Sequence, residues 1–281
     1  MSVAPGAEAE LETVVHERSP AIIDGLLSLS PRLERWTPEF LAERYGERRV
    51  RVYDASFGEP GRNYMGSISA MPFAEFLDEI FAGGRDLRMF LHNVRTGFPE
   101  MLEDVVFPDL NLRFSRSFVY SFFGCQGATT PLHYDIDMGC VLHTALHGKR
   151  RVRLFAPDQS RWLYRHPFTV RSYVDLDRPD FDAYPELSRA RGVEVVLEPG
   201  QTLFMPAGYW HEFHYLEPGF GLSLRASSPR VMDRAAGALN LLLLSPTDRL
   251  MNKLSPGRWF DWKQSLARGR AAANPEMSGQ L

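Results

Sequence analysis

The chain has little cysteine and no long apolar run. Only two of its 281 residues are cysteines, Cys125 and Cys140, which is too few for a disulfide framework. The longest apolar stretch, around residues 235–244, is far shorter than the ~20 residues that a membrane-spanning helix needs. The first residues, MSVAPGAEAELETVV, lack the basic segment and apolar core of a signal peptide. We therefore expect a cytoplasmic protein with reduced, buried thiols and no membrane partner.

An excess of positive charge is also missing. The formal net charge is −3, whereas a nucleic-acid-binding domain usually carries a basic face, so we expect no nucleic-acid partner. Hydrophobic residues make up 44% of the chain and charged residues 24%, which is typical of a globular protein with a sizeable core.

Two helices and then a series of short strands are predicted along the chain. Thr37-Pro38-Glu39 combines an N-cap, a proline at the first helical position and an acidic first turn, and Gly46 ends that helix. A second helix begins after Met71-Pro72 and ends at Gly83-Gly84. Strands are predicted at 49–53, 87–91, 117–123, 140–146, 151–155, 193–197, 202–205, 212–216 and 221–224. Many short strands separated by turn residues predict a sandwich or a barrel.

The chain divides most simply into one β domain with helical flanks. Residues 1–15 are polar and without periodicity, which predicts a mobile N-terminal arm. The β domain is expected to span residues 16–228, with an insert at 158–191 that forms a long loop over its rim. Residues 229–281 show helical periodicity again, with an apolar stripe that could face the core or a partner.

The segment TPLHYDIDMG (residues 130–139) contains the first candidate metal ligands. On an extended segment, residues i and i+2 project to the same face, so His133 and Asp135 can point together into a barrel. A histidine and an aspartate at this spacing often occur together by chance, so the hypothesis of a metal site requires a third ligand.

The segment PAGYWHEFHYL (residues 206–216) offers two candidates for that ligand. His211 and His214 are three apart and face opposite sides of a strand, so only one can join the site; His211 is preferred, with His214 as the alternative. Two histidines and one carboxylate form the facial triad that holds non-haem Fe(II) and leaves neighbouring positions open. Zinc accepts the same ligands, so the residue types alone do not determine the metal.

Several segments resemble the JmjC-related, cupin-like Fe(II)/2-oxoglutarate-dependent oxygenases, a family that includes the asparaginyl hydroxylase acting on hypoxia-inducible factor. The resemblance implies a double-stranded β-helix, or jelly roll, with His133, Asp135 and His211 as both the catalytic residues and the iron ligands. It spans most of residues 19–228, and its clearest stretches are TTPLHYD (129–135), HGKRRVRLFAPDQ (147–159), YVDLDRPDFDAYPEL (173–187) and VVLEPGQTLFMPAGYWH (195–211).

A buried dicarboxylate such as 2-oxoglutarate needs a cation and a hydroxyl for its distal carboxylate. In the strand after Gly148, Arg150 shares a face with Val152 and Leu154, so it is predicted to point inward. Members of the family usually have a lysine at this position, and Thr130 matches their hydroxyl partner. The cofactor-binding residues are therefore predicted to be Thr130 and Arg150.

The chain departs from the family pattern at three further positions around the expected site. Phe90 replaces a tyrosine, and Val141 and Ala226 replace asparagines. These changes support an alternative function, a cupin-like binding module without oxygenase activity. A zinc-dependent hydrolase is a weaker alternative, because no general base is evident beside the triad.

The predicted function is an Fe(II)- and 2-oxoglutarate-dependent hydroxylase. The resemblance implies a reaction that couples oxidative decarboxylation of 2-oxoglutarate to hydroxylation of a second substrate. That substrate is expected to be a peptide or protein side chain, or else a small metabolite. In relatives a pair of C-terminal helices mediates dimerisation, so a homodimer through residues 229–281 is also expected.

Overall fold

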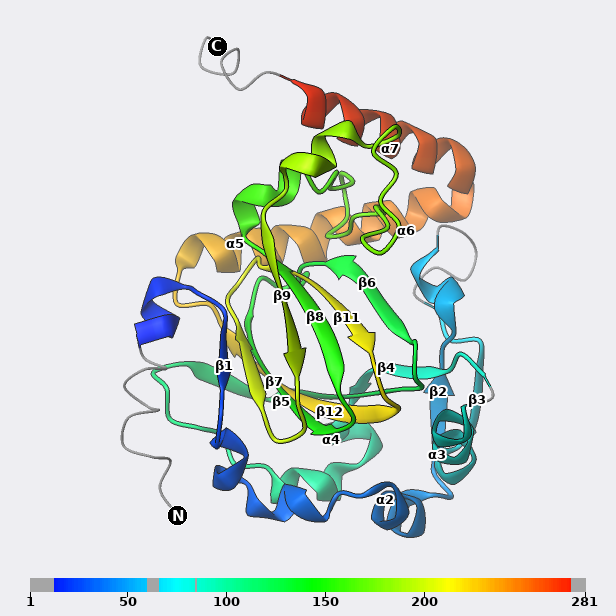
Figure 1. The fold of residues 1–281 in the computed structure, drawn as a ribbon, viewed down its shortest axis with the longest axis vertical. Coiled ribbons are helices and arrows are strands. Elements are labelled where there is room, and N and C mark those ends of the chain that lie inside the picture. The colour runs from blue at the N-terminus through cyan, green and yellow to red at the C-terminus, as the bar shows by residue number, and fades with distance from the viewer. Residues whose placement is uncertain (1–12, 60–65, 84, 274–281) are drawn as a thin grey trace.

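Two antiparallel sheets face each other and form the jelly roll that was predicted (Figure 1). The computed structural model describes residues 13–59, 66–83 and 85–273. The larger sheet contains, in spatial order, β1 (Ala21–Ile23), β10 (Thr202–Met205), β7 (Cys140–His147), β12 (Gly219–Ser227), β5 (Arg113–Gly124) and β4 (Arg88–Asn93). The smaller sheet contains β6 (Thr129–His133), β11 (Trp210–Tyr215), β8 (Arg150–Phe155) and β9 (Gly192–Leu197).

All the predicted strands are present, and three others were missed. The missed strands are β1, β6 and β3 (Ser69–Pro72), which pairs with β2 (Arg49–Val52) in a separate hairpin. β6 contains Pro131, which cannot donate a backbone hydrogen bond and is confined to edge strands in sheets. It is tolerated because β6 is the edge strand of the smaller sheet, next to β11.

The N-terminal helices pack on the outer face of the larger sheet. The two predicted helices are α2 (Pro38–Tyr45), capped by the Thr37 side chain, and α3 (Phe73–Ala82). Phe73 and Phe76 of α3 contact Phe123 of β5, with ring centroids 5.3 and 6.3 Å apart. Short helical segments complete this region: α4 (Val94–Gly97) and the 3₁₀ turns Leu26–Leu29, Pro31–Arg35, Ala55–Gly58 and Pro99–Asp104.

A separate apolar cluster fills the interior between the two sheets. Val141 and Ala145 of the larger sheet face Val152, Leu154 and Phe213 of the smaller one. These residues come from strands whose side chains alternate between the two faces, as the sequence pattern indicated. Both cysteines are buried and unpaired, as expected.

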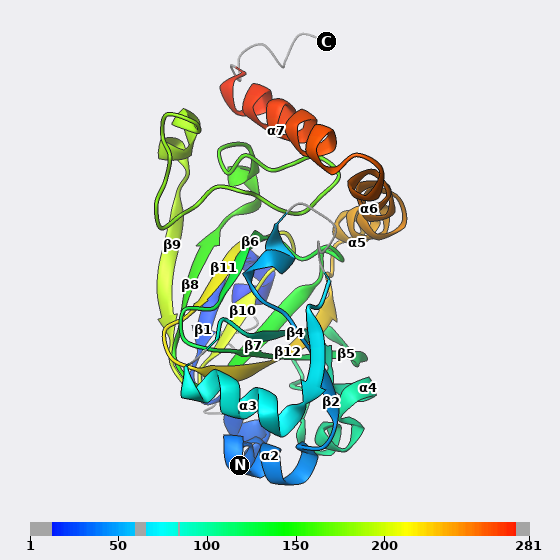
Figure 2. The same ribbon diagram turned by 90° about the vertical axis from the view of Figure 1, so that its right-hand side faces the viewer.

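The C-terminal helices lie at the opposite end of the barrel from α2 and α3, a separation that both views show (Figures 1 and 2). They are α5 (Val231–Leu239), a π-helical turn (Asn240–Leu244), α6 (Ser245–Leu254) and α7 (Pro256–Ala272). The insert between β8 and β9 is irregular apart from 3₁₀ turns at Pro157–Arg161 and Pro185–Arg189. It packs beneath α7 through a cluster that includes Leu163, Tyr164 and Leu187 with Ala267 and Ala271 of the helix.

The apolar stripe of these helices does not belong to the core. Leu239, Leu242 and Leu243 are at least half exposed, and Leu242 is 80% exposed. The side of α6 that faces the protein is polar instead: Asp248 accepts hydrogen bonds from Lys263 at 2.6 Å and from Trp259 at 2.7 Å. The interpretation of the stripe as core is therefore wrong.

The expected division into three parts stays a prediction. Residues 1–12 of the predicted mobile arm lie outside the described residues, whereas residues 13–17 are helical, and Val14 and Val15 pack on the core. The last strand ends at Ser227, next to the predicted boundary between residues 228 and 229. In the described part of the chain, none of the helices is long and apolar enough to cross a membrane.

Candidate metal centre

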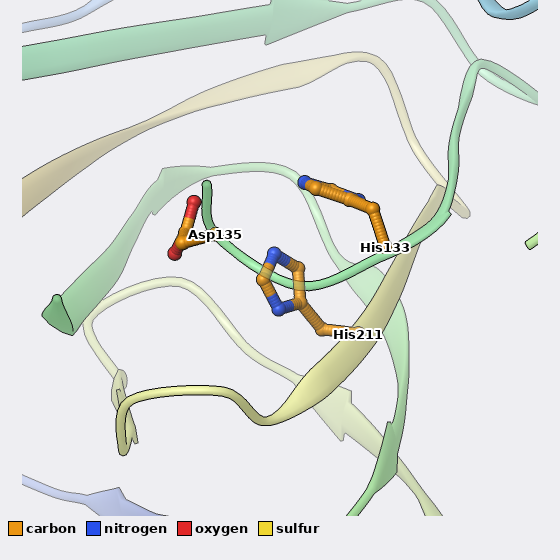
Figure 3. Close-up of side chains that lie close together, drawn as sticks. All are labelled: His133, Asp135 and His211. Carbon is orange, nitrogen blue, oxygen red and sulfur yellow. The ribbon is translucent and has the colours of Figure 1, made fainter. Parts of the chain in front are cut away.

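The pairing of β6 with β11 places the two candidate histidines side by side. In this antiparallel pair His211 lies directly opposite His133, and their ring centroids are 4.3 Å apart. Asp135 follows two residues after His133, just beyond the end of β6, and its carboxylate turns toward both rings (Figure 3). Ligand atoms of His133, Asp135 and His211 all lie within 4.8 Å of one another.

His214 lies on the other side of β11, as the strand parity predicted. Its Nδ1 is 2.9 Å from the hydroxyl of Thr129, and it takes no part in the cluster. Of the two candidates for the third ligand, the structure therefore brings only His211 to His133 and Asp135.

Backbone carbonyls determine which nitrogen of each histidine carries the proton. Nδ1 of His133 is 2.7 Å from the Pro131 carbonyl, and Nδ1 of His211 is 3.1 Å from the Tyr209 carbonyl. A carbonyl can only accept, so Nδ1 donates in both residues and each Nε2 keeps its lone pair. Hydrogen bonds of this kind orient histidine ligands in metal sites.

The electrostatics favour two neutral imidazoles and one carboxylate. Burial lowers the pKa of His133 to about 3 and also lowers the pKa of His211. Burial by itself would raise the pKa of Asp135, but the charge and hydrogen bond of Arg225 together with the two neighbouring histidines outweigh it, and the pKa falls to about 2. These are the protonation states in which all three side chains can bind a divalent cation.

Arg225 holds the carboxylate in place. Its Nη2 is 2.6 Å from Asp135 Oδ1 and 2.8 Å from Asp137 Oδ1, and its Nε donates to Asp137 Oδ2 at 3.2 Å. The sequence does not reveal the pairing of Arg225 with Asp135, because the two residues are 90 apart in the chain and no local pattern connects them. Asp137 was an available signal, since it repeats the two-residue spacing of His133 and Asp135.

The cluster opens into a cavity of about 340 Å³, which is within the usual range for ligand pockets. Apolar side chains make up most of its wall, including Leu91, Phe118, Phe122, Phe168 and Leu241. Polar side chains also line it, among them Thr130, His143, Tyr215 and Ser223. The cavity thus combines an apolar wall with a few polar contacts, as small-molecule sites generally do.

Arg150 is fully buried and points inward, and Lys149 forms an ion pair with Glu198 at 3.1 Å on the surface. The predicted strand register is therefore confirmed. Arg150 nevertheless does not line the cavity: it lies against the ring of Tyr215, 4.8 Å from the ring centroid, and its Nη1 is 2.9 Å from Nε2 of His143. Tyr215 and His143, which both line the cavity, separate Arg150 from it.

The remaining contacts of Arg150 are to backbone carbonyls. Its Nη2 donates to His147 O at 3.1 Å and to Phe220 O at 2.8 Å. Among the described residues no carboxylate pairs with Arg150, and burial lowers its pKa. A buried guanidinium without a counter-charge is costly, so an anion in the neighbouring cavity would stabilise it.

His143 and Ser223 are further cavity residues that the sequence analysis did not assign. Because a guanidinium can only donate, Nε2 of His143 accepts from Arg150, and the proton of His143 must lie on Nδ1. That Nδ1 is 2.8 Å from the Ser223 hydroxyl, which therefore acts as acceptor toward His143 and keeps its own proton for a cavity ligand. The orientation of the Ser223 hydroxyl thus depends on contacts between β8, β7 and β12.

A jelly roll that carries a His-x-Asp…His cluster in its interior is the architecture of the cupin class. The chain belongs to the cupin-like domain family, whose sequence profile matches residues 7–225, and its relatives include JmjC-type proteins.

The chain is similar in sequence to proteins that have several different names. A tRNA wybutosine-synthesizing protein 5 from Danio rerio is 31% identical over 241 residues, covering 77% of this chain and 71% of the relative. Lysine-specific demethylase 8 from Xenopus tropicalis is 27% identical over 218 residues, covering 73% of this chain and 47% of the relative. An HSPB1-associated protein 1 homolog from Danio rerio is 32% identical over 195 residues, covering 66% of this chain and 42% of the relative.

We expect replacement of any one of His133, Asp135 and His211 by alanine to abolish tight binding of a divalent metal. Each replacement leaves two ligands, whereas His214→Ala leaves all three and should bind one metal per chain. Binding is measured by titration with Mn(II) or anaerobic Fe(II). A His211→Ala variant that keeps its metal, together with a His214→Ala variant that loses it, would move the third ligand to His214.

Proposed function

We propose that this protein is an Fe(II)- and 2-oxoglutarate-dependent oxygenase that hydroxylates a peptide or protein side chain, or a small metabolite. The observation that carries the proposal is the His133, Asp135 and His211 cluster, which faces a largely apolar cavity. Membership of the JmjC-related, cupin-like family supports it.

The three side chains suit Fe(II) as ligands. Two neutral imidazoles with free Nε2 lone pairs and one ionised carboxylate form the donor set of the facial triad. When bound, iron and 2-oxoglutarate would together activate dioxygen, the oxidant that converts a C–H bond into C–OH and 2-oxoglutarate into succinate and carbon dioxide. The protein provides the orientation: Pro131 and Tyr209 carbonyls fix the two rings, and Arg225 fixes the carboxylate.

The polar interior of the cavity is the proposed seat of 2-oxoglutarate. Thr130 and Ser223 offer hydroxyl donors, and Arg150 supplies a positive charge behind His143. Tyr215 compensates for the phenol that is missing at Phe90: it lines the same cavity, and burial raises its pKa, so its hydroxyl stays protonated and can donate. A distal carboxylate placed here would gain several donors and a nearby cation.

The apolar wall indicates the kind of group that is hydroxylated. Leu91, Phe118, Phe168 and Leu241 surround the approach to the cluster, and a hydrocarbon portion of the substrate would pack against them. The relatives' names refer to tRNA in one case and to lysine in another. These two names point to different classes of substrate. Our proposal of a peptide or small-molecule substrate, without nucleic acid, rests instead on the net charge of −3.

The alternative is a cupin-like binding module that has lost its oxygenase activity. Phe90 and Val141 line the cavity and offer no polar contact, and Ala226 is buried close by. The complete ligand cluster argues against a module that binds no metal, because such a module has no need for two oriented imidazoles beside an ionised carboxylate. A metal-bound module without oxygenase activity is distinguished by the turnover test below.

A second copy of the chain is the proposed partner of the C-terminal helices. Leu239, Leu242, Leu243, Leu250 and Leu254 expose between 50% and 80% of their surface along one continuous helical segment. An exposed apolar surface of this extent on helices generally marks an association site, and two copies could cover it by packing their helices together.

The turnover test uses purified protein with Fe(II), oxygen and 2-oxoglutarate. We expect slow formation of succinate even without the second substrate, at a rate clearly above that of His133→Ala. We also expect 2-oxoglutarate to bind more tightly in the presence of a saturating divalent metal. Two results together would favour the binding module: succinate formation no faster than in His133→Ala, and an affinity for 2-oxoglutarate that is the same with and without the metal.

Arg150→Ala should weaken 2-oxoglutarate binding, because it removes the positive charge that lies behind His143 and Tyr215 at the proposed seat. Arg150→Lys keeps the charge and should lose less. Lys149→Ala is the matched control, since this lysine pairs with Glu198 on the surface. Affinity is measured calorimetrically under nitrogen with saturating metal, and retained metal binding shows that each variant is folded. If Arg150→Ala binds as the wild type does, Arg150 is not part of the seat.

Leu242→Glu should convert a dimer into a monomer, because it places a charge at the centre of the exposed leucines. Phe181→Glu is the control, since Phe181 is also half exposed but lies in the insert, away from the C-terminal helices. The mass in solution is measured by sedimentation or light scattering. A wild-type protein that is monomeric at tens of micromolar would contradict the proposed dimer.

A further inference from the structure

Helix α5 presents its polar and small residues to the protein and its apolar residues to solvent. The buried positions are Asp233, Gly237 and the following Asn240, spaced four and three residues apart on one face. Asp233 anchors the start of the helix by accepting from Ser228 Oγ at 2.6 Å and from Arg18 at 3.1 Å. The other two contact the loop that follows His133: Gly237 lies against the backbone of Asp137, and Asn240 binds the carbonyl of Ile136.

Gly237 lies so close to the loop that a side chain at this position would clash with it. A Cβ atom at this position would lie 2.1 Å from the carbonyl oxygen of Asp137 and 2.6 Å from its carbonyl carbon. The neighbouring atoms belong to the backbone, so they cannot move aside as a flexible side chain could. The helix thus lies directly on the backbone two residues after Asp135.

Asn240 adds a hydrogen bond to the same loop. Its Nδ2 donates to the carbonyl of Ile136 at 3.1 Å, and the asparagine is buried. Gly237 and Asn240 together contact both residues that follow Asp135 directly.

The loop itself needs support from outside. It leaves the sheet after His133, and its internal bonds are few: Met138 N donates to Asp135 O at 3.0 Å, and Gly139 N donates to Asp137 Oδ1 at 3.3 Å. Met138 has φ = 52°, in the left-handed region that side chains other than glycine and asparagine rarely adopt. A strained conformation of this kind persists only when surrounding contacts enforce it.

We propose that α5 is a positioning element for the metal centre, with Gly237 and Asn240 holding the loop 136–138 so that Asp135 faces His133 and His211. The proposal rests on the metal site proposed above. Arg225 holds the carboxylate of Asp135. Gly237 and Asn240 contact the backbone of the two residues that follow Asp135. Neither Gly237 nor Asn240 lines the cavity, so their effect on the metal is exerted through the loop.

Gly237→Ala tests the proposal through the metal site. In a helix interior, alanine is more favourable than glycine by about 1 kcal/mol, so a loss in this variant does not come from helix propensity. If the contact with Asp137 does not position Asp135, Gly237→Ala leaves metal binding unchanged. If it holds the loop, the added methyl group pushes helix and loop apart, and metal affinity falls.

The experiment compares Gly237→Ala and Asn240→Ala with Gly269→Ala, using Mn(II) as the probe. Gly269 lies in α7 with nothing within 4 Å of an added Cβ, which makes it the matched control. We expect Gly237→Ala and Asn240→Ala to bind Mn(II) about 10- to 100-fold more weakly, as is usual when support of a metal ligand is removed. Gly269→Ala should bind as the wild type does.

Hydrogen–deuterium exchange of the metal-free protein supplies a second readout that does not depend on the metal. Peptides covering residues 134–139 should exchange about tenfold faster in Gly237→Ala and Asn240→Ala than in the wild type, because opening of the loop becomes easier. The β8 peptide 150–155 should be unaffected, which excludes general unfolding.

The outcomes separate this proposal from the proposed function. Wild-type Mn(II) affinity and wild-type exchange in both variants overturn the positioning role. A wild-type protein that binds no metal overturns the proposed function, while the exchange measurement still decides whether α5 holds the loop. If Gly237→Ala does not fold, Asn240→Ala decides, since it removes atoms and creates no clash.

Discussion

The pairing of β6 with β11 is the constraint on which the candidate site depends. It places His211 opposite His133, and the chain then leaves the sheet so that Asp135 can turn toward both rings. A shift of one residue in this pairing would turn one histidine to the outer face, where His214 now lies against Thr129. β8 on the other side of β11 restrains the register, because six consecutive residues of the two strands are paired.

Two buried arginines of this barrel have different surroundings. Burial alone would lower the pKa of Arg225, but Asp135 and Asp137 outweigh it and raise that pKa above its ordinary value. Arg150 has only carbonyls, an imidazole and an aromatic ring around it, and burial lowers its pKa. The first arginine is satisfied within the protein and organises a ligand. The second stays short of negative charge, which is consistent with an anionic co-substrate in the adjoining cavity.

The C-terminal helices reverse the usual amphipathic arrangement. Buried faces of soluble helices are normally apolar, yet α5 and α6 bury Asp233, Gly237, Asn240 and Asp248 and expose their leucines. The buried polar groups are all used: they bind the N-terminal segment, the loop after Asp135, and α7. This leaves the leucines free for another surface, and it links the helices closely to the candidate metal centre.

Features that depend on neighbouring residues could be predicted from the amino-acid sequence. Strand parity placed His133 with Asp135, turned Arg150 inward and showed that His211 and His214 could not share a site, while Thr37 and Gly46 marked the limits of α2. Three other features required the folded chain: which histidine joins the cluster, the position of His143 between Arg150 and the cavity, and the contact of Arg225 with Asp135. The apolar stripe in residues 229–281 was correctly predicted to be helical, but its periodicity could not show which side of the helix faces the protein. The physical reason is the same in each case: periodicity and capping report forces within a few residues, whereas these contacts join strands and helices that are distant in sequence and meet only when the sheets close.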